Sequence, residues 1–143
     1  MTKKFDQELH DKYDPVARKL AIKYFSDIGL TCIPNTDKYK IDLVVNNKFY
    51  VDVEVKTAWS GHWNDFKYSE LNIPDRKEKY LGLDKPSLFM VISKDYSYGF
   101  VVEDKILKQC KKELHPNKYD ENEYFFKVPL KKCLKVKFKK GEV

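Results

Sequence analysis

The stretch KIDLVVNNKFYVDVEVK, residues 40–56, decides the fold that we expect for this chain. It reads as two consecutive strands, because apolar residues alternate with polar ones on both sides of a turn signal at Asn46 and Asn47. Residues two apart on a strand point to the same face of a sheet. One face of the second strand is therefore apolar, and the other is charged. The charged face holds Tyr50, Asp52, Glu54 and Lys56.

The length of the turn decides whether Asp42, near the start of the first strand, joins this charged face. A strict two-residue loop would place Asp42 opposite Val51. A loop of three residues, 46–48, would place it opposite Asp52, with Glu54 on the diagonal and on the same face. Such loops need a residue in the left-handed conformation, which Asn tolerates better than most non-glycine residues. We therefore predict the three-residue loop, and with it three carboxylates on one surface.

Three carboxylates on one surface repel each other. At an effective dielectric constant of about 20, two unit charges 4 Å apart interact by roughly 4 kcal/mol. Lys56 supplies only one compensating charge, so we expect a hard divalent cation with oxygen ligands, with Mg²⁺ as the first candidate. The alternative is a set of solvated charges on an exposed antiparallel face. Aspartate is disfavoured in strands, and its presence twice in this hairpin favours the metal site.

The residues Asp42 and then Glu54-Val55-Lys56 resemble the motif of the PD-(D/E)XK, or restriction-endonuclease-like, nuclease superfamily. That motif is an acid, a spacer, and then acid-x-Lys on a core strand. Ile41 stands where the family often has proline. The resemblance covers residues 40–56 directly, and the order of the expected elements extends it to residues 14–102.

The resemblance implies an α/β (α+β) fold with a central mixed β-sheet flanked by helices, and it implies a metal-dependent phosphodiesterase. In the family, the two acids, here Asp42 and Glu54, bind one or two Mg²⁺ ions together with a main-chain carbonyl, here that of Val55. Mn²⁺ is expected to substitute for Mg²⁺. The lysine, here Lys56, orients or activates the attacking water. This chemistry is physically consistent, because a metal polarises the phosphate and lowers the pKa of a bound water.

A helix should precede the hairpin. Asp14-Pro15 predicts its start, with Asp14 as the N-cap, and Gly29 predicts its end. Many family members carry a metal-binding glutamate on this helix, but residues 15–28 contain none. Glu8, in the polar arm 1–13, and Asp14 remain as candidate additional acids, each of which a structural role explains better.

Asp52 is a further candidate acid, in the outer shell of the site. The residues that follow the motif suggest contacts to nucleic acid. Trp59 and Trp63 belong to an aromatic loop that could stack on bases, or that could instead form a flap over the sheet edge. Pro74 opens a short helix, DRKEKYLG, whose basic residues could hold a phosphate. They are Arg76, Lys77 and Lys79. RecB-type members of the family have Gln-x-x-x-Tyr here, and this chain has Arg76-x-x-x-Tyr80, so that subgroup is not supported.

The rest of the chain completes the expected sheet. Residues 87–93 form a continuous apolar run that predicts a central strand buried on both faces, and residues 98–102 predict its neighbour. Residues 103–114 read as a lysine-rich helix ended by His115-Pro116-Asn117. Residues 124–128 read as a short aromatic strand, and residues 134–138 as a terminal edge strand with a lysine face. Lysine often serves only to prevent aggregation at such an edge, so nucleic-acid binding there is the lesser alternative.

Composition sets limits on the class of protein. The 143 residues suit one domain, and residues 103–143 hold twelve lysines and seven acids, a net +5 of the total +6. This excess suits a polyanionic partner or merely a soluble basic surface. The three widely spaced cysteines suggest neither zinc nor a disulfide framework, and a reducing cytoplasm is the expected compartment, the host's if the protein is phage-encoded. The sequence predicts no membrane span, no secretory signal and no small-molecule cofactor.

These observations predict a single-domain Mg²⁺-dependent endonuclease that acts on DNA. The chain has no room for a separate sequence-reading domain, so we expect it to recognise a junction, a nick, an end or the backbone alone. Small phage or mobile-element nucleases and junction resolvases are the nearest comparison, and a resolvase would have to be a homodimer. The alternatives are a non-catalytic nucleic-acid- or protein-binding module on the same fold, and an RNA-directed nuclease.

Overall fold

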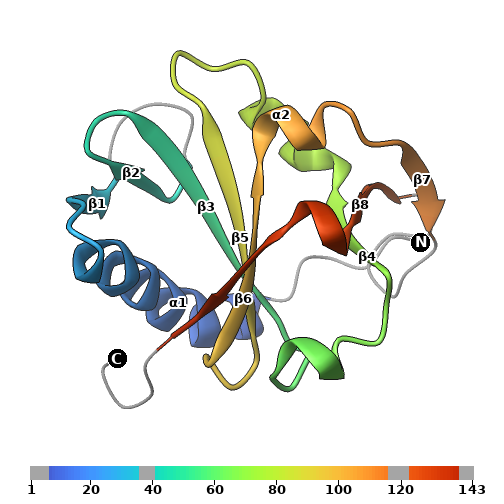
Figure 1. Cartoon of the computed structure of the whole chain (residues 1–143), viewed down its shortest axis with the longest axis horizontal. Helices are drawn as coiled ribbons and strands as arrows, with labels where there is room; N and C mark the ends of the chain where they lie inside the picture. Colours follow the sequence, from blue (N-terminus) through green and yellow to red (C-terminus); the bar gives the residue numbers. More distant parts are fainter. Residues whose placement is uncertain (1–6, 36–40, 116–122, 139–143) are drawn as a thin grey trace.

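The computed structural model describes residues 7–35, 41–115 and 123–138, with the backbone alone for residues 7–14 and 115. It shows a mixed α/β arrangement of two sheets with few helices (Figure 1). The larger, mixed sheet contains, in spatial order, β1 (Cys32–Pro34), β2 (Leu43–Val45), β3 (Phe49–Lys56), β5 (Ser87–Ser93), β6 (Tyr98–Glu103) and β9 (Leu134–Lys137). The smaller, antiparallel sheet contains β4 (Glu70–Pro74), β8 (Glu123–Pro129) and β7 (Lys112–His115). The helices are α1 (Gln7–Asp27), α2 (Asp104–Leu107) and the 3-10 helices η1 (Trp63–Asp65), η2 (Asp75–Tyr80) and η3 (Leu130–Lys132).

The β2–β3 hairpin has the predicted three-residue loop. Leu43 pairs with Val51 and Val45 pairs with Phe49, which leaves residues 46–48 in the turn. Asn46 and Asn47 both adopt the left-handed conformation, with φ of 50° and 54°. The Asn46 side chain also accepts a hydrogen bond from the backbone N–H of Thr31 at 2.7 Å, which ties the turn to the start of β1. The prediction from turn chemistry is confirmed.

Strand β5 lies at the centre of the larger sheet and pairs in parallel with β3. Its bounds, Ser87–Ser93, are those predicted from the apolar run, and nearly all of its side chains are buried. A parallel pair cannot be joined by a tight turn. The connecting residues 57–86 therefore travel across one face of the sheet, and they form η1, β4 and η2 on the way.

The two faces of the larger sheet have different covers (Figure 1). Helix α1 packs on one face, where a buried apolar cluster includes Leu20, Phe25, Leu43, Val53 and Met90. The opposite face is covered mainly by the smaller sheet and short helices, with Leu71, Ile73, Phe89, Phe100 and Phe126 in its buried cluster. The predicted mixed sheet is thus confirmed. The expected covering by a helix is present on the α1 side, whereas the smaller sheet and short helices cover the opposite face.

Helix α1 corrects one predicted boundary and confirms the other. The helix runs from Gln7 through Pro15, so the prediction that Asp14 is its N-cap is wrong, and the predicted N-terminal arm is helical from Gln7. Pro15 lacks a backbone N–H and so removes one intrahelical hydrogen bond, and its ring crowds the carbonyl four residues before it. At the other end, Gly29 is left-handed, with φ of 86°, and its N–H bonds to the carbonyl of Ser26 as predicted for a C-terminal cap.

The predicted helix over residues 103–114 is wrong in its second half. Helix α2 ends at Leu107, and residues 112–115 form β7, which pairs with β8. Leu114, which a helix would have buried, is 45% exposed. Lys112 instead forms ion pairs with Asp75 and Glu78 of η2. The predicted helix end at residues 115–117 falls largely outside the described residues. Strand β9 is an edge strand, as predicted.

The short helix predicted after Pro74 is present as the 3-10 helix η2, and the aromatic strand predicted at residues 124–128 is the centre of β8. Of the helices in the described ranges, none is both long and apolar enough to cross a membrane.

Candidate functional site

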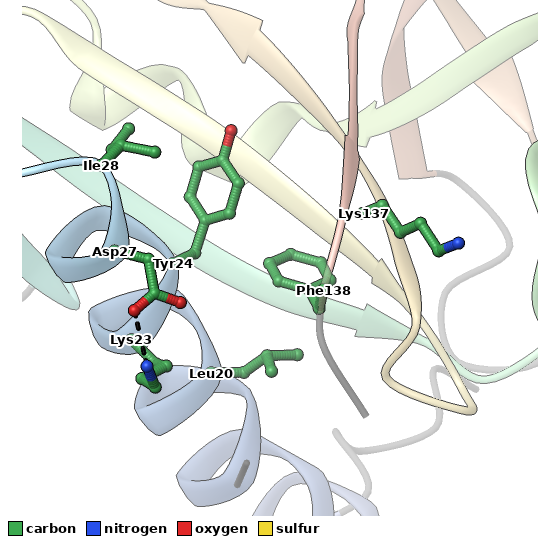
Figure 2. Close-up of a pocket in the computed structure, with 7 residues that line it drawn as sticks. All are labelled: Leu20, Lys23, Tyr24, Asp27, Ile28, Lys137 and Phe138. Atoms are coloured by element: carbon green, nitrogen blue, oxygen red, sulfur yellow. Dashed lines mark hydrogen bonds and ion pairs between the residues drawn. The ribbon is translucent and has the colours of Figure 1, made fainter. Parts of the chain in front are cut away.

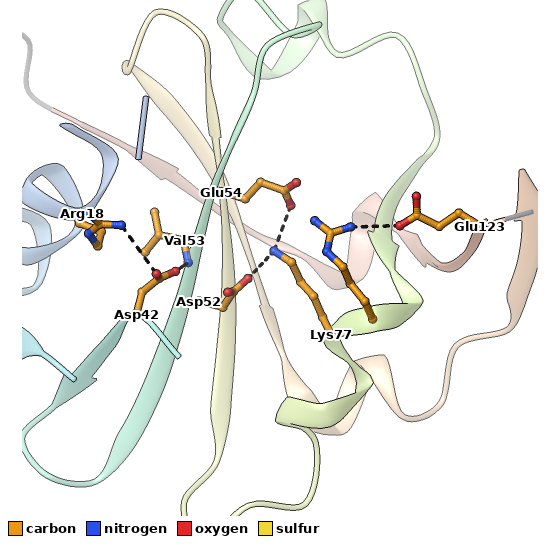
Figure 3. Close-up of polar contacts among 8 residues, drawn as sticks. Arg18, Asp42, Asp52, Val53, Glu54, Lys77 and Glu123 are labelled. Atoms are coloured by element: carbon orange, nitrogen blue, oxygen red, sulfur yellow. Dashed lines mark hydrogen bonds and ion pairs between the residues drawn. The ribbon is translucent and has the colours of Figure 1, made fainter. Parts of the chain in front are cut away.

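The register of the hairpin places Asp42 opposite Asp52 (Figure 3). Asp42 lies just before β2, and its Oδ2 accepts a hydrogen bond from the backbone N–H of Val53 at 2.8 Å. Its Oδ1 lies 3.9 Å from Nη1 of Arg18, which reaches over from α1. The carboxylate of Asp42 is therefore fixed at the start of β2, between the helix and the charged face of β3.

Lys77 of η2 is the cation nearest to the acids on β3 (Figure 3). Its Nζ lies 2.5 Å from Oδ2 of Asp52 and 3.2 Å from Oε2 of Glu54. Its side chain is only 9% exposed. Lys77 was predicted to hold a phosphate, but in this structure it is buried against two carboxylates. It supplies the second positive charge that the carboxylate cluster required.

Burial and like charges set the protonation of Asp52. Burial raises the pKa of Asp52 to about 6, and the neighbouring carboxylates of Asp42 and Glu54 also raise it, while the Lys77 ammonium offsets part of the shift. Burial would lower the pKa of Lys77, but Glu54 and Asp52 hold its proton and raise that pKa above its ordinary value. Lys77 therefore stays charged, and Asp52 is the acid of the pair that titrates near neutral pH.

Glu54 and Lys56 have different surroundings from Asp52 and Lys77. Burial alone would raise the pKa of Glu54, but Lys77, Lys56 and Arg76 lower it below the ordinary value, so Glu54 is ionised. Burial lowers the pKa of Lys56, Glu54 opposes this shift, and Lys77 and Lys127 add to it. Across the part of the chain that the structure describes, Lys56 makes no hydrogen bond or ion pair at contact distance. An amine of lowered pKa without a bound partner can accept a proton or orient a water.

The other two basic residues that were predicted to contact a phosphate, Arg76 and Lys79, lie on the outer side of η2. Arg76 is exposed and donates a hydrogen bond to Oε1 of Glu123 at 3.0 Å. Lys79 is exposed, and its Nζ lies 5.2 Å from the centroid of the Tyr80 ring. Both side chains remain accessible to a phosphate, in contrast to Lys77.

The aromatic loop after β3 divides into a core residue and a surface residue. Trp59 is 2% exposed. Its ring stacks on Phe100 with centroids 5.0 Å apart, and its Nε1–H donates to the carbonyl of His62 at 2.7 Å. A base-stacking role for Trp59 is contradicted by this burial, which favours the flap alternative for that part of the loop. Trp63 is half-buried, and its Nε1–H donates to the carbonyl of Gly99 at 3.1 Å.

The two further candidate acids on the N-terminal segment, Glu8 and Asp14, both lie on α1. Their side chains lie outside the described part of the chain, so their roles as additional acids stay predictions. Val55, whose carbonyl the resemblance assigns to the metal, lies on β3 beside Ile92 of β5.

The donor chemistry of the site suits a hard divalent ion, because Asp42, Asp52 and Glu54 offer carboxylate oxygens. In the described residues, however, no group of three or more His, Cys, Asp or Glu side chains is close enough together to hold a metal ion. The Lys77 ammonium already lies between Asp52 and Glu54. These residues fit Mg²⁺ by ligand type, and we expect ion binding to require that Lys77 release Glu54.

A separate pocket opens on the α1 side of the larger sheet (Figure 2). It has a volume of about 280 Å³ and lies between the end of α1 and β9. Its lining includes Tyr24, Phe138 and the ion pair of Lys23 with Asp27, whose Nζ and Oδ1 are 2.5 Å apart. None of the predicted site residues lines this pocket.

Comparisons of this chain with protein-family models, with curated proteins and with solved structures found no match.

Proposed function

We propose that this protein is a Mg²⁺-dependent endonuclease of the restriction-endonuclease-like class that hydrolyses DNA phosphodiester bonds. The observation that supports this most is the hairpin register, which aligns Asp42 with Asp52 and sets Glu54 and Lys56 on the same face of β3. The order α1, β1, β2, β3 and β5, with β3 and β5 parallel, is compatible with the fold of that class.

The proposal gives each residue a distinct role. Asp42 and Glu54, with the carbonyl of Val55, would hold the metal, which when bound polarises the scissile phosphate and lowers the pKa of water. Lys56 would orient or activate the attacking water. Arg76, exposed on η2, would contact the phosphate backbone. Lys77 keeps Asp52 and Glu54 in place before the ion binds.

Lys77 also favours a second candidate function, a non-catalytic binding module. The Lys77 ammonium pairs with Asp52 and Glu54, and together with Lys56 it offsets the charge of these two acids without any metal. On this alternative, the acids are a structural ion-pair network, and the protein binds nucleic acid or another protein without cutting.

A cleavage assay separates these functions. Plasmid, branched DNA, single-stranded DNA and RNA are incubated with the protein in Mg²⁺, in Mn²⁺ and in EDTA. The test variants are Glu54→Gln and Lys56→Ala, and the matched control is Lys48→Ala, an exposed lysine in the loop of the same hairpin. We expect metal-dependent cutting of DNA that both test variants lose and the control keeps.

Binding without cutting in either metal would support the binding module instead. Cutting of RNA alone would make the enzyme a ribonuclease. Cutting that persists in both test variants would contradict the proposed site. If branched DNA is the preferred substrate and both strands are cut symmetrically, light scattering should show a homodimer, because two active sites are then needed.

A further inference from the structure

Lysines of β9 lie beside aromatic rings of β6 and of the segment around η1, on the outer part of the larger sheet. We call this the aromatic–lysine surface, and it consists of His62, Trp63, Tyr98, Lys135 and Lys137. The Nζ of Lys135 lies 5.9 Å from the centroid of the Trp63 ring, and the Nζ of Lys137 lies 5.8 Å from that of Tyr98. Each ammonium therefore covers one ring.

The strand registers place this surface on the same face of the sheet as the carboxylates. Directly paired residues on neighbouring strands point to the same face. One such row crosses four strands and contains Glu54, Val91, Phe100 and Lys135. Strands are spaced about 4.8 Å apart, so Lys135 lies roughly 14 Å across the sheet from Glu54. Lys137 also lines the pocket beside α1, at the edge of the sheet (Figure 2).

Among the described residues, no acidic group forms an ion pair with the lysines of this surface. Lys135 and Lys137 are exposed and form no ion pair with an acidic group, and the same holds for Lys131 and Lys132 of η3, counting the part of the chain that the structure describes. A lysine that served only to protect a sheet edge would need no ring beneath it. On the edge strand β9, by contrast, Lys135 and Lys137 each lie beside a half-buried aromatic ring.

The rings are held rigidly. The Trp63 and Tyr98 rings pack edge to face with their centroids 4.9 Å apart. The centroid of the His62 ring also lies 4.9 Å from that of Tyr98. The Trp63 indole is fixed by its hydrogen bond to Gly99. Fixed rings beside exposed lysines suit single-stranded nucleic acid, because bases can stack on the rings while ammonium groups contact the phosphates.

We propose that the aromatic–lysine surface binds a single-stranded stretch of DNA. Lys135 and Lys137 contact its phosphates, and bases stack on Trp63 and Tyr98. A duplex cannot use the rings in this way, because its base faces are covered by their neighbours. The inference rests on the proposed function for its partner, DNA, but it does not depend on cleavage.

Binding is measured by fluorescence anisotropy with a short labelled single strand, in EDTA so that no cutting occurs. The test variant is Lys135→Gln with Lys137→Gln. The matched control is Lys19→Gln with Lys48→Gln, two exposed lysines on α1 and on the hairpin loop that lower the net charge equally. At about 0.1 M salt we expect the test variant to lose affinity on the order of 20-fold, and the slope of log affinity against log salt to fall by about 1.4. The control should bind nearly as the unchanged protein does.

A second readout tests the stacking. The chain has two tryptophans, and Trp59 is buried, so quenching of tryptophan emission by the bound strand should come from Trp63. The variant Trp63→Phe should abolish this quenching. Equal losses in the test and control lysine variants, quenching that persists in Trp63→Phe, or tighter binding of a duplex than of a single strand would each overturn the proposal.

The two proposals can fail separately. Single-strand binding that depends on Lys135 and Lys137, with no cutting in Mg²⁺, would keep the surface and reject the nuclease. Cutting that is unaffected by the loss of Lys135 and Lys137 would do the reverse.

Discussion

The two faces of β3 are both largely covered, but they are built differently. The face toward α1 carries Val51 and Val53 in an apolar cluster. The other face carries Asp52 and Glu54, which hold the buried ammonium of Lys77. Buried ion pairs seldom stabilise a fold more than well-packed apolar residues of similar size. The first face is therefore explained by stability, whereas the second calls for a functional explanation.

The largest expected effect concerns the chemistry of the charged face. The variant Lys56→Met keeps the side-chain length but removes the amine, and we expect single-turnover cleavage to fall about 10²- to 10⁴-fold. Because Lys56 makes no hydrogen bond or ion pair at contact distance in the described residues, urea unfolding should show only a small change in stability. The variant Val53→Ala should behave in the opposite way, with lower stability and an unchanged cleavage rate. A Lys56→Met protein that cuts normally would remove the functional difference between the faces.

The next effect concerns the buried cation. At about pH 8, Lys77→Met should destabilise the protein by about 3–5 kcal/mol, because it leaves the Asp52 carboxylate buried and unpaired. At about pH 5 the loss should be smaller, since Asp52, with its pKa raised to about 6, can take up a proton. Leu43→Ala, on the α1 side, should cost about 2–5 kcal/mol at either pH. Chemical unfolding at both pH values provides the measurement, and equal losses for Lys77→Met would contradict it.

The titration of Asp52 gives a slightly smaller effect with a definite sign. Its pKa is about 6 in the folded protein and ordinarily 3.8, so the folded state binds the proton more tightly. Its contribution to stability therefore declines as the pH rises from about 4 to about 6, by roughly 3 kcal/mol. Glu54, whose pKa is lowered, contributes in the opposite direction. The difference in unfolding free energy between the unchanged protein and Asp52→Asn isolates the Asp52 term, and a pH-independent difference would refute it.

The smallest effect concerns the turn that sets which face Asp42 joins. Asn46→Gly keeps the left-handed conformation but loses the hydrogen bond to Thr31, so we expect a loss of about 1 kcal/mol. Asn47→Gly is the matched control, because Asn47 is also left-handed and its replacement should be nearly neutral. Thermal unfolding of both variants provides the comparison. A larger loss for Asn47→Gly would show that this residue, rather than Asn46, holds the register.

The features that could be predicted from the sequence are local ones. The three-residue loop followed from two asparagines, the end of α1 from Gly29, and the central strand from the apolar run 87–93. The features that could not be predicted depend on partners distant in the chain. Lys77 meets Asp52 because η2 crosses over β3, and Trp59 is buried because it stacks on Phe100.

The same contrast explains the error after residue 103. The spacing of apolar residues there suits a helix, but residues 112–115 pair with β8, which follows in the chain. A basic residue on the segment that connects two parallel strands was the one signal that could have pointed to Lys77, because such segments cross the sheet near the ends of its strands.

The parallel pairing of β3 with β5 has a consequence for how the molecule is assembled. The β2–β3 hairpin can form from neighbouring residues, whereas the β3–β5 pair must first close a loop of residues 57–86, at a cost in chain entropy. Lys77 lies within that loop, so its contact with Asp52 should form after the folding transition state. Loss of Lys77 should then accelerate unfolding and leave the refolding rate nearly unchanged.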